Sequence, residues 1–253
     1  IRLDNEKDEL YYTYVRTLRG VFANLADTTY PSLKSLEIIP RFALNYKKGN
    51  NDFYIVVARG YKTGGFNSTF ERPEDLTFEP EYSWNYETGI KSGFFKNKLY
   101  ADLALFYIDW KNQQIYQTVP SGRGSMLKNA GHTASKGVEL SLRANPVKDL
   151  DINVSYGYTN ATFLSYYVDS NTSYDKNFLP YVPRHTVSAQ ATKTFNVPKS
   201  VIIEKIRVNL LYRGTGDIYW NEANSSKQDF YSLVDGKISF IRNWLQLDIW
   251  AKN

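Results

Sequence analysis

Apolar and polar residues alternate with a period of two along most of this chain, from about Leu36 to the C-terminus. In residues 150–158, every even position is apolar or aromatic and every odd position is polar or glycine. Residues 138–144 repeat the pattern, with Glu139 and Arg143 on the polar side. Successive side chains of a β-strand point to opposite faces of a sheet. The sequence therefore predicts an all-β fold whose strands have one apolar and one wet face.

The connections between these strands alternate between two lengths. Short polar turns, such as residues 145–149, lie at one end of the strand pairs. Long loops of roughly 15–25 residues, rich in aromatic, Asn, Ser and charged residues, lie at the other end; we expect them at 20–35, 62–82, 113–134, 162–184 and 214–229. Short turns on one side and long loops on the other are typical of an outer-membrane β-barrel. A soluble β-sandwich has no reason to collect its long loops at one end.

The number of strands indicates part of a larger barrel. We count about eleven strands, most of them near ten residues, with the first near residues 9–19. About ten residues let a tilted strand cross a bilayer, and bacterial single-chain barrels have even strand numbers. The first residues do not resemble a natural N-terminus, and the last ones fall inside a strand pattern. We therefore expect residues 1–253 to be a single-domain portion of an antiparallel transmembrane β-barrel.

The composition agrees with a barrel and excludes several other classes. Aromatic residues make up 16% of the chain, which suits the aromatic girdles of a barrel at the two membrane interfaces. The mean hydropathy is −0.47, and no segment approaches the run of about 18 apolar residues that a membrane helix needs. The sequence has no Cys, which excludes disulfides and thiolate metal sites. The net charge of +5 comes from scattered Lys and Arg, without the basic cluster of a nucleic-acid-binding surface.

The sequence carries no motif for catalysis or for a cofactor. P-loop, HExxH, GxSxG and dinucleotide-binding signatures are absent. The two histidines, His132 and His185, lie near junctions of strands and loops, and one surface His without a partner is not a metal site. We therefore expect a protein that is not an enzyme and that holds no metal or cofactor.

Five stretches of this sequence, in family order, resemble the C-terminal barrel portion of TonB-dependent outer-membrane receptors. They are RGYKTGGFN at 59–67, FEPEYSWNYETGIKS at 78–92, FYIDWKNQQ at 106–114, NAGHTASKGVEL at 129–140 and LPYVPRHT at 179–186. Their wording is closer to siderophore- and haem-type receptors than to glycan importers of the same family, whose counterpart of the Asn-Ala-Gly phrase usually has Val or Ile in place of Ala.

The resemblance implies a specific place and task for the chain. It implies about half of a 22-stranded barrel in the bacterial outer membrane, without the family's plug domain, its TonB box and the final strand. Lipid would contact the apolar face. The receptor would bind a scarce nutrient outside the cell, such as a ferric siderophore or another iron complex, and admit it when the TonB–ExbB–ExbD complex pulls on the plug.

Two groups of residues are candidates for function. Aromatic and basic loop side chains suit a ferric chelate, because flat rings stack and cations attract its negative charge; the candidates are Phe66, Arg72, Tyr116, Arg123, Tyr219 and Trp220. The second group consists of charged residues that the alternation places on the polar, lumen-facing side, where they would pair with one another or with a plug; they are Glu87, Lys91, Glu139 and Arg143.

Two alternatives stay open at this stage. A soluble all-β glycan-binding module or enzyme would use loop Tyr and Trp as sugar platforms, and it would bury its apolar face. A glycan-importing or unplugged outer-membrane barrel would keep that face exposed to lipid. The sequence does not name the ligand, because ligand-binding loops share no motif across the family.

Overall fold

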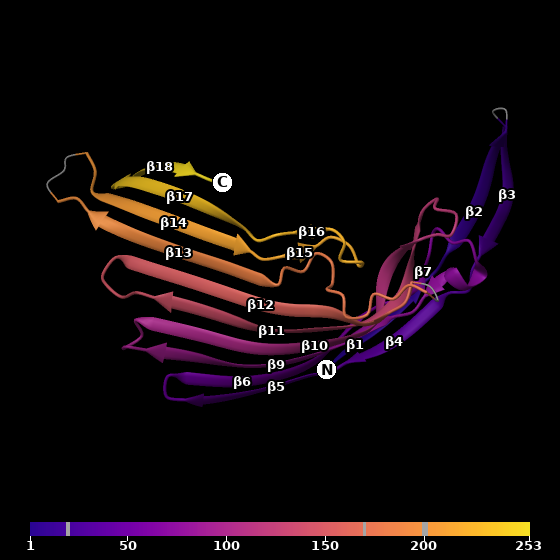
Figure 1. Ribbon diagram of the computed structural model, residues 1–253, viewed down its shortest axis with the longest axis horizontal. Helices are drawn as coiled ribbons and strands as arrows, with labels where there is room; N and C mark the ends of the chain where they lie inside the picture. Colours follow the sequence, from indigo (N-terminus) through magenta and orange to yellow (C-terminus); the bar gives the residue numbers. More distant parts are fainter. Residues whose placement is uncertain (19–20, 169–170, 199–201) are drawn as a thin grey trace.

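The computed structural model describes residues 1–18, 21–168, 171–198 and 202–253. In this part of the chain, ten strands form one sheet, and every neighbouring pair is antiparallel. Their spatial order is β18 (Leu245–Ala251), β17 (Tyr231–Arg242), β14 (Lys205–Thr215), β13 (His185–Asn196), β12 (Leu150–Tyr166), β11 (Ser125–Ala144), β10 (Leu99–Thr118), β9 (Glu81–Phe94), β6 (Asn51–Lys62) and β5 (Arg41–Lys48). The sheet is open, with β5 and β18 at its edges (Figure 1). The expected antiparallel all-β fold is confirmed.

A long hairpin precedes β5 and forms two separate two-stranded sheets. It pairs β1 (Arg2–Asp8) with β4 (Leu33–Ile39), and β2 (Tyr11–Leu18) with β3 (Val21–Thr29). Pro40 separates β4 from β5, because proline has no N–H for the ladder. If β1–β2 and β3–β5 each count as one interrupted strand, the described chain has the eleven long strands that the alternation predicts. Short elements lie in the loops: β7 (Gly65–Phe66), η1 (Pro73–Asp75), β8 (Thr77–Phe78), β15 (Ile218–Tyr219) and β16 (Lys227–Gln228).

Two of the expected long loops are largely strand. The loop expected at 20–35 is wrong, because β3 and β4 occupy most of it, and the first strand starts at Arg2. The loop expected at 113–134 is also wrong, because β10 continues to Thr118 and β11 begins at Ser125. Both segments carry polar residues on the two sides, so the period-two signal fades while the backbone ladder continues. Arg19 and Gly20, at the expected boundary of strand and loop, lie outside the described residues.

The extended part of β10–β11, residues 111–132, is called the arm here. It begins at a change of register: Trp110 pairs with Thr133, but Gln113 pairs with Gly131, and the intervening Asn112 has a positive φ of 54°. Such bulges bend a strand and are common at the rims of barrels. The arm, the first hairpin and the loops lie at one end of the sheet, and the short turns lie at the other (Figure 1).

The sheet keeps its apolar face open. Leu103, Leu105 and Tyr107 of β10 are 39%, 48% and 41% exposed, and Leu247 and Ile249 of β18 are 60% and 58% exposed. No second sheet covers this face in the described part of the chain. A β-sandwich would bury these side chains, so the soluble-module alternative is not supported. Among the described residues, no helix is long and apolar enough to cross a membrane.

The packed core lies among the loops rather than on the sheet. Its buried cluster consists of Ala161, Phe163, Tyr166 and Leu179, which come from the end of β12 and the loop after it. Ile115 of the arm packs against this cluster, together with Tyr174 and Val182. Apolar burial therefore holds the loop after β12 against the end of that strand and against the arm.

A glycine lets an aromatic ring lie flat on the polar face. The Tyr54 ring covers Gly89, and a Cβ at position 89 would lie 2.6 Å from Tyr54 Cε1 and 2.6 Å from the Leu103 carbonyl oxygen. Tyr54 O–H then donates to Glu87 Oε1 at 2.8 Å. Position 89 therefore requires the absence of a side chain, since a backbone oxygen cannot rotate away.

We expect Gly89→Ala to lower the free energy of unfolding by about 1–3 kcal/mol, the usual cost of overpacking a close contact. The measurement is urea-induced unfolding of the full receptor in detergent. Gly236→Ala on β17 is the matched control, because its nearest atom, Leu210 Cδ2, would be 3.7 Å away. Equal effects of both substitutions would contradict the proposed role of Gly89.

Candidate functional site

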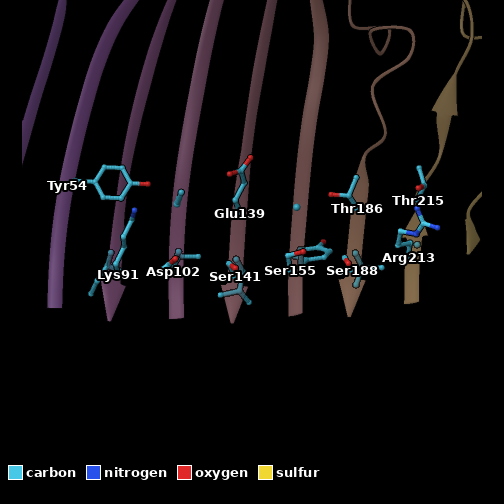
Figure 2. Close-up of a pocket in the computed structure, with 18 residues that line it drawn as sticks. Tyr54, Lys91, Asp102, Glu139, Ser141, Ser155, Thr186, Ser188, Arg213 and Thr215 are labelled. Atoms are coloured by element: carbon cyan, nitrogen blue, oxygen red, sulfur yellow. The ribbon is translucent and has the colours of Figure 1, made fainter. Parts of the chain in front are cut away.

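The polar face of the sheet forms a hollow across β6 to β14. Figure 2 shows Tyr54, Lys91, Asp102, Glu139 and Arg213 at this hollow, each from a different strand. Hydroxyl side chains line the hollow between them: Ser141, Ser155, Thr186, Ser188 and Thr215. A neighbouring hollow nearer the short turns is lined by Arg143. The face is thus wet and charged along its length, as the alternation predicts.

The four predicted lumen residues share this face but do not pair with each other. Glu87 accepts the Tyr54 hydrogen bond, and the Lys91 ammonium lies 5.8 Å from the centre of the Tyr54 ring. Glu139 and Arg143 have no ion-pair partner among the described residues. These charges are available to whatever occupies the hollow, so their role stays a prediction.

Other charges on the same face are compensated locally. Arg213 Nη2 lies 2.7 Å from Asp235 Oδ2 across β14 and β17, and Lys237 Nζ lies 3.6 Å from Asp248 Oδ2 across β17 and β18. Both ion pairs join neighbouring strands of the sheet. The unpaired Glu139 and Arg143 are different, because burying either of them against a partner would require a matching charge.

The loop between β6 and β9 is bound to the arm through amide side chains. Asn67, which is 5% exposed, accepts from Leu127 N–H at 2.7 Å and donates to Leu127 O at 2.9 Å and Asp75 O at 2.8 Å. Gln114 Nε2 donates to Thr63 O at 2.6 Å, and its backbone N–H donates to Glu81 Oε2 at 2.6 Å. The loop and the arm therefore form one unit, called the first loop unit here.

Four predicted ligand residues lie on the first loop unit. Phe66 packs at 6.4 Å from the Tyr30 ring, and Arg72 is exposed just before η1. Arg123 is exposed at the tip of the arm, where hydrogen bonds between Ser121 and Glu71 bring its turn next to the Arg72 segment. Tyr116 is 72% exposed on a strand of the arm, although the sequence places it in a loop.

The loops after β12 and β14 form a second loop unit. The ring of Tyr219 stacks on Phe178 at 5.5 Å with an interplanar angle of 2°, and Arg184 Cζ lies 4.6 Å from the Phe178 ring centre. Asn224 closes the unit: its Oδ1 accepts from Phe178 N–H at 2.7 Å, and its Nδ2 donates to Phe178 O at 2.9 Å. Trp220 is 40% exposed at the surface of this unit.

Sequence reasoning missed the residues that hold the second unit together. Phe178, Tyr181 and Asn224 do not stand out by type, and their contacts join segments more than 35 residues apart. The only available signal was the LPYVPRHT phrase at 179–186, which contains Tyr181 and Arg184. The six predicted ligand residues thus fall into two units, four in the first and two in the second.

Carboxylates fix both the conformation and the charge of the second unit. Asp175 accepts from the Tyr166 backbone N–H at 2.7 Å, and this bond lowers the pKa of the Asp175 carboxyl. Lys227 Nζ lies 2.8 Å from Asp229 and 2.9 Å from Asp217. These contacts raise the pKa of Lys227 and lower the pKa of Asp217. The charges are therefore fixed at neutral pH.

The sequence suggested that His132 has no partner, but the structure shows one. Its Nε2 lies 2.5 Å from Asp109 Oδ1, and Lys111 approaches the same carboxylate at 3.8 Å. The described residues contain no group of three or more His, Cys, Asp or Glu that could hold a metal ion. The arrangement is a hydrogen bond between His132 and a carboxylate at the base of the arm, and Lys111 forms an ion pair with the same carboxylate.

Comparison with known proteins identifies one family whose model matches the whole chain. A model of the family described as TonB dependent receptor-like, beta-barrel, matches residues 1–253. The ferrichrome outer membrane transporter/phage receptor of Escherichia coli K12 is 26% identical over 164 residues, covering 64% of this chain and 20% of that protein. The aligned part of the chain therefore spans about a fifth of the length of this relative.

Solved structures of similar fold have low sequence identity. The ferric yersiniabactin uptake receptor FyuA of Yersinia pestis aligns with 99% of this chain and 36% of its own, at a TM-score of 0.78 and 19% identity. The siderophore receptor PiuA of Acinetobacter baumannii aligns with 90% of this chain and 34% of its own, at a TM-score of 0.67 and 20% identity. At these identities the likeness shows the shared fold alone.

We expect Asn67→Ala to release the loop from the arm. The substitution removes three hydrogen bonds and leaves the Leu127 N–H and C=O without partners, a loss of about 2–4 kcal/mol in local stability. Hydrogen exchange of residues 63–80 in the full receptor measures this change. Ser68→Ala, at an exposed neighbour, is the control and should leave exchange unchanged. Unaltered protection in Asn67→Ala would contradict the proposed role of Asn67.

We expect acid to loosen the second loop unit at Asp175. Because the folded-state pKa of Asp175 lies below that of an unfolded Asp, its stabilisation is present above about pH 4 and is lost as the pH falls through the folded-state pKa. Exchange of the Tyr166 amide, corrected for the intrinsic rate, should therefore rise at low pH. Asp175→Asn keeps an acceptor but does not titrate, and it should remove this pH dependence.

Proposed function

Because the chain belongs to the TonB dependent receptor-like β-barrel family, we propose that it forms part of the wall of an outer-membrane receptor that imports an iron complex. The observation that carries this proposal is the two-sided sheet. One face is apolar and exposed, as lipid contact requires, and the other is hydroxyl-rich and charged, as a water-filled or protein-filled lumen requires.

The proposed ligand is a ferric siderophore or a similar ferric complex. The relatives support this choice by their names, which describe a ferrichrome transporter, a ferric yersiniabactin uptake receptor and a siderophore receptor. The loop units add chemical support, because they expose Arg72, Arg123 and Trp220 at the end away from the short turns. The six ligand-residue candidates stay predictions within this proposal.

The energy for import would come from outside the wall. We propose that residues 1–253 are one barrel segment, that a plug domain occupies the lumen, and that the TonB–ExbB–ExbD complex acts on the plug. Glu87, Lys91, Glu139 and Arg143 are the wall charges that would face it. The wall itself then performs no bond chemistry: it binds, encloses and releases the ligand.

We expect deletion of the gene to abolish uptake of one iron complex by iron-starved cells. The measurement is accumulation of labelled iron or cobalt from a panel of ferric siderophores, haem and cobalamin. Restoration by the intact gene, but not in a strain that lacks TonB, would place the receptor in energised import. Uptake of every compound at the parental rate would contradict an iron receptor and favour glycan import, the alternative ligand class.

A further inference from the structure

Tyr181 holds a backbone conformation that its side chain does not favour. Its φ is +64°, in the left-handed region, and it follows Pro180 in a turn. The position after a turn proline often needs positive φ, and glycine or asparagine is the usual residue there. A tyrosine at such a site is strained, so a gain elsewhere must retain it.

That gain does not come from burial of the ring. Tyr181 is 70% exposed, although Leu179, two residues before it in the chain, is buried in the cluster with Phe163 and Tyr166. The backbone alone would satisfy the turn: Tyr181 N–H donates to Tyr219 O at 2.9 Å. Any residue except proline would make this bond, and glycine would make it without strain.

The exposed ring forms a corner with a second aromatic residue. The Tyr181 and Trp220 rings lie edge to face, with centroids 5.6 Å apart and planes at 65°. Trp220 N–H donates to Ser226 O at 2.9 Å, so the backbone donors of both residues are already used. The corner therefore offers flat π-surface to solvent rather than free backbone hydrogen-bond donors.

The corner rests on a rigid support. Tyr219, next to Trp220, stacks on Phe178, and Asn224 fixes the Phe178 backbone through two hydrogen bonds. Arg184 covers Phe178 at 4.6 Å and adds a positive charge to the stack, which disfavours a cationic guest. A surface held in place before binding loses little conformational entropy when a ligand arrives.

We propose that Tyr181 and Trp220 form a subsite that receives an aromatic ring of the ferric chelate. A planar ring can stack on one member of the corner while its edge meets the other, which are the arrangements that aromatic pairs prefer. The inference rests on the proposed function and narrows it: the cargo carries aryl groups, such as catecholates or phenolates bound to iron. Tyr181 is then a specificity-determining residue.

The test measures dissociation constants of the purified full receptor for two probes, a ferric tris-catecholate and an aryl-free ferric trihydroxamate. Tyr181→Gly removes the ring and relieves the strain, so failure to fold does not confuse the result. We expect it to weaken catecholate binding about tenfold and to leave hydroxamate binding unchanged, and we expect Tyr181→Phe to keep wild-type affinity.

Phe95→Gly is the matched control. Phe95 is also an exposed aromatic residue with positive φ, at 75% exposure and +53°, but it lies in the turn before β10 at the other end of the sheet. Equal catecholate affinities in Tyr181→Gly and Phe95→Gly would overturn the subsite. Tight binding of the hydroxamate without binding of the catecholate would overturn it and leave the proposed function intact. Binding of neither probe would overturn both.

Discussion

Backbone hydrogen bonding is the constraint on which the rest of this structure depends. A strand in hydrocarbon has no water to satisfy its N–H and C=O groups, so each must bond to a neighbouring strand. The ladder from β5 to β18 meets this demand for its inner strands. It also fixes register: Leu103 lies opposite Leu140, and Asp102 lies opposite Ser141. A slip of one residue would turn Leu103 to the polar face and Asp102 to the apolar face, so one register serves both faces.

Local periodicity explains what the sequence could predict. In β12, residues 150–158 alternate strictly, and the strand and its faces follow from that pattern alone. The same parity places Glu139 and Arg143 on the polar face. The arm could not be found this way, because polar residues fall on both of its sides and no apolar stripe marks it. Its pairing, such as Tyr116 with Leu127, is a property of the backbone.

The contacts of the candidate site, in contrast, could not be predicted from local sequence patterns. Tyr219 and Trp220 could be selected as exposed aromatic residues of a loop, but their partners Phe178 and Tyr181 come from another loop. Contacts of that kind are decided by how two loops pack, and neither loop encodes them separately. The positive φ of Tyr181 is equally invisible in the sequence, where Pro-Tyr-Val-Pro suggests an extended segment. The strain becomes evident only in the structure, where the Tyr181 N–H donates to Tyr219 O and the turn has its observed φ.

The register change at Asn112 has a consequence for how such a chain diversifies. The shift in strand register is confined to a few residues. The pairing of Trp110 with Thr133, and of the strand residues between these two and the short turns, is therefore independent of the pairing in the arm. Residues inserted or lost beyond Asn112 would alter the reach of the arm without rotating a single wall side chain. The bulge therefore separates two parts of the chain: a wall whose register is fixed by its two faces, and an arm whose length can change independently of that register.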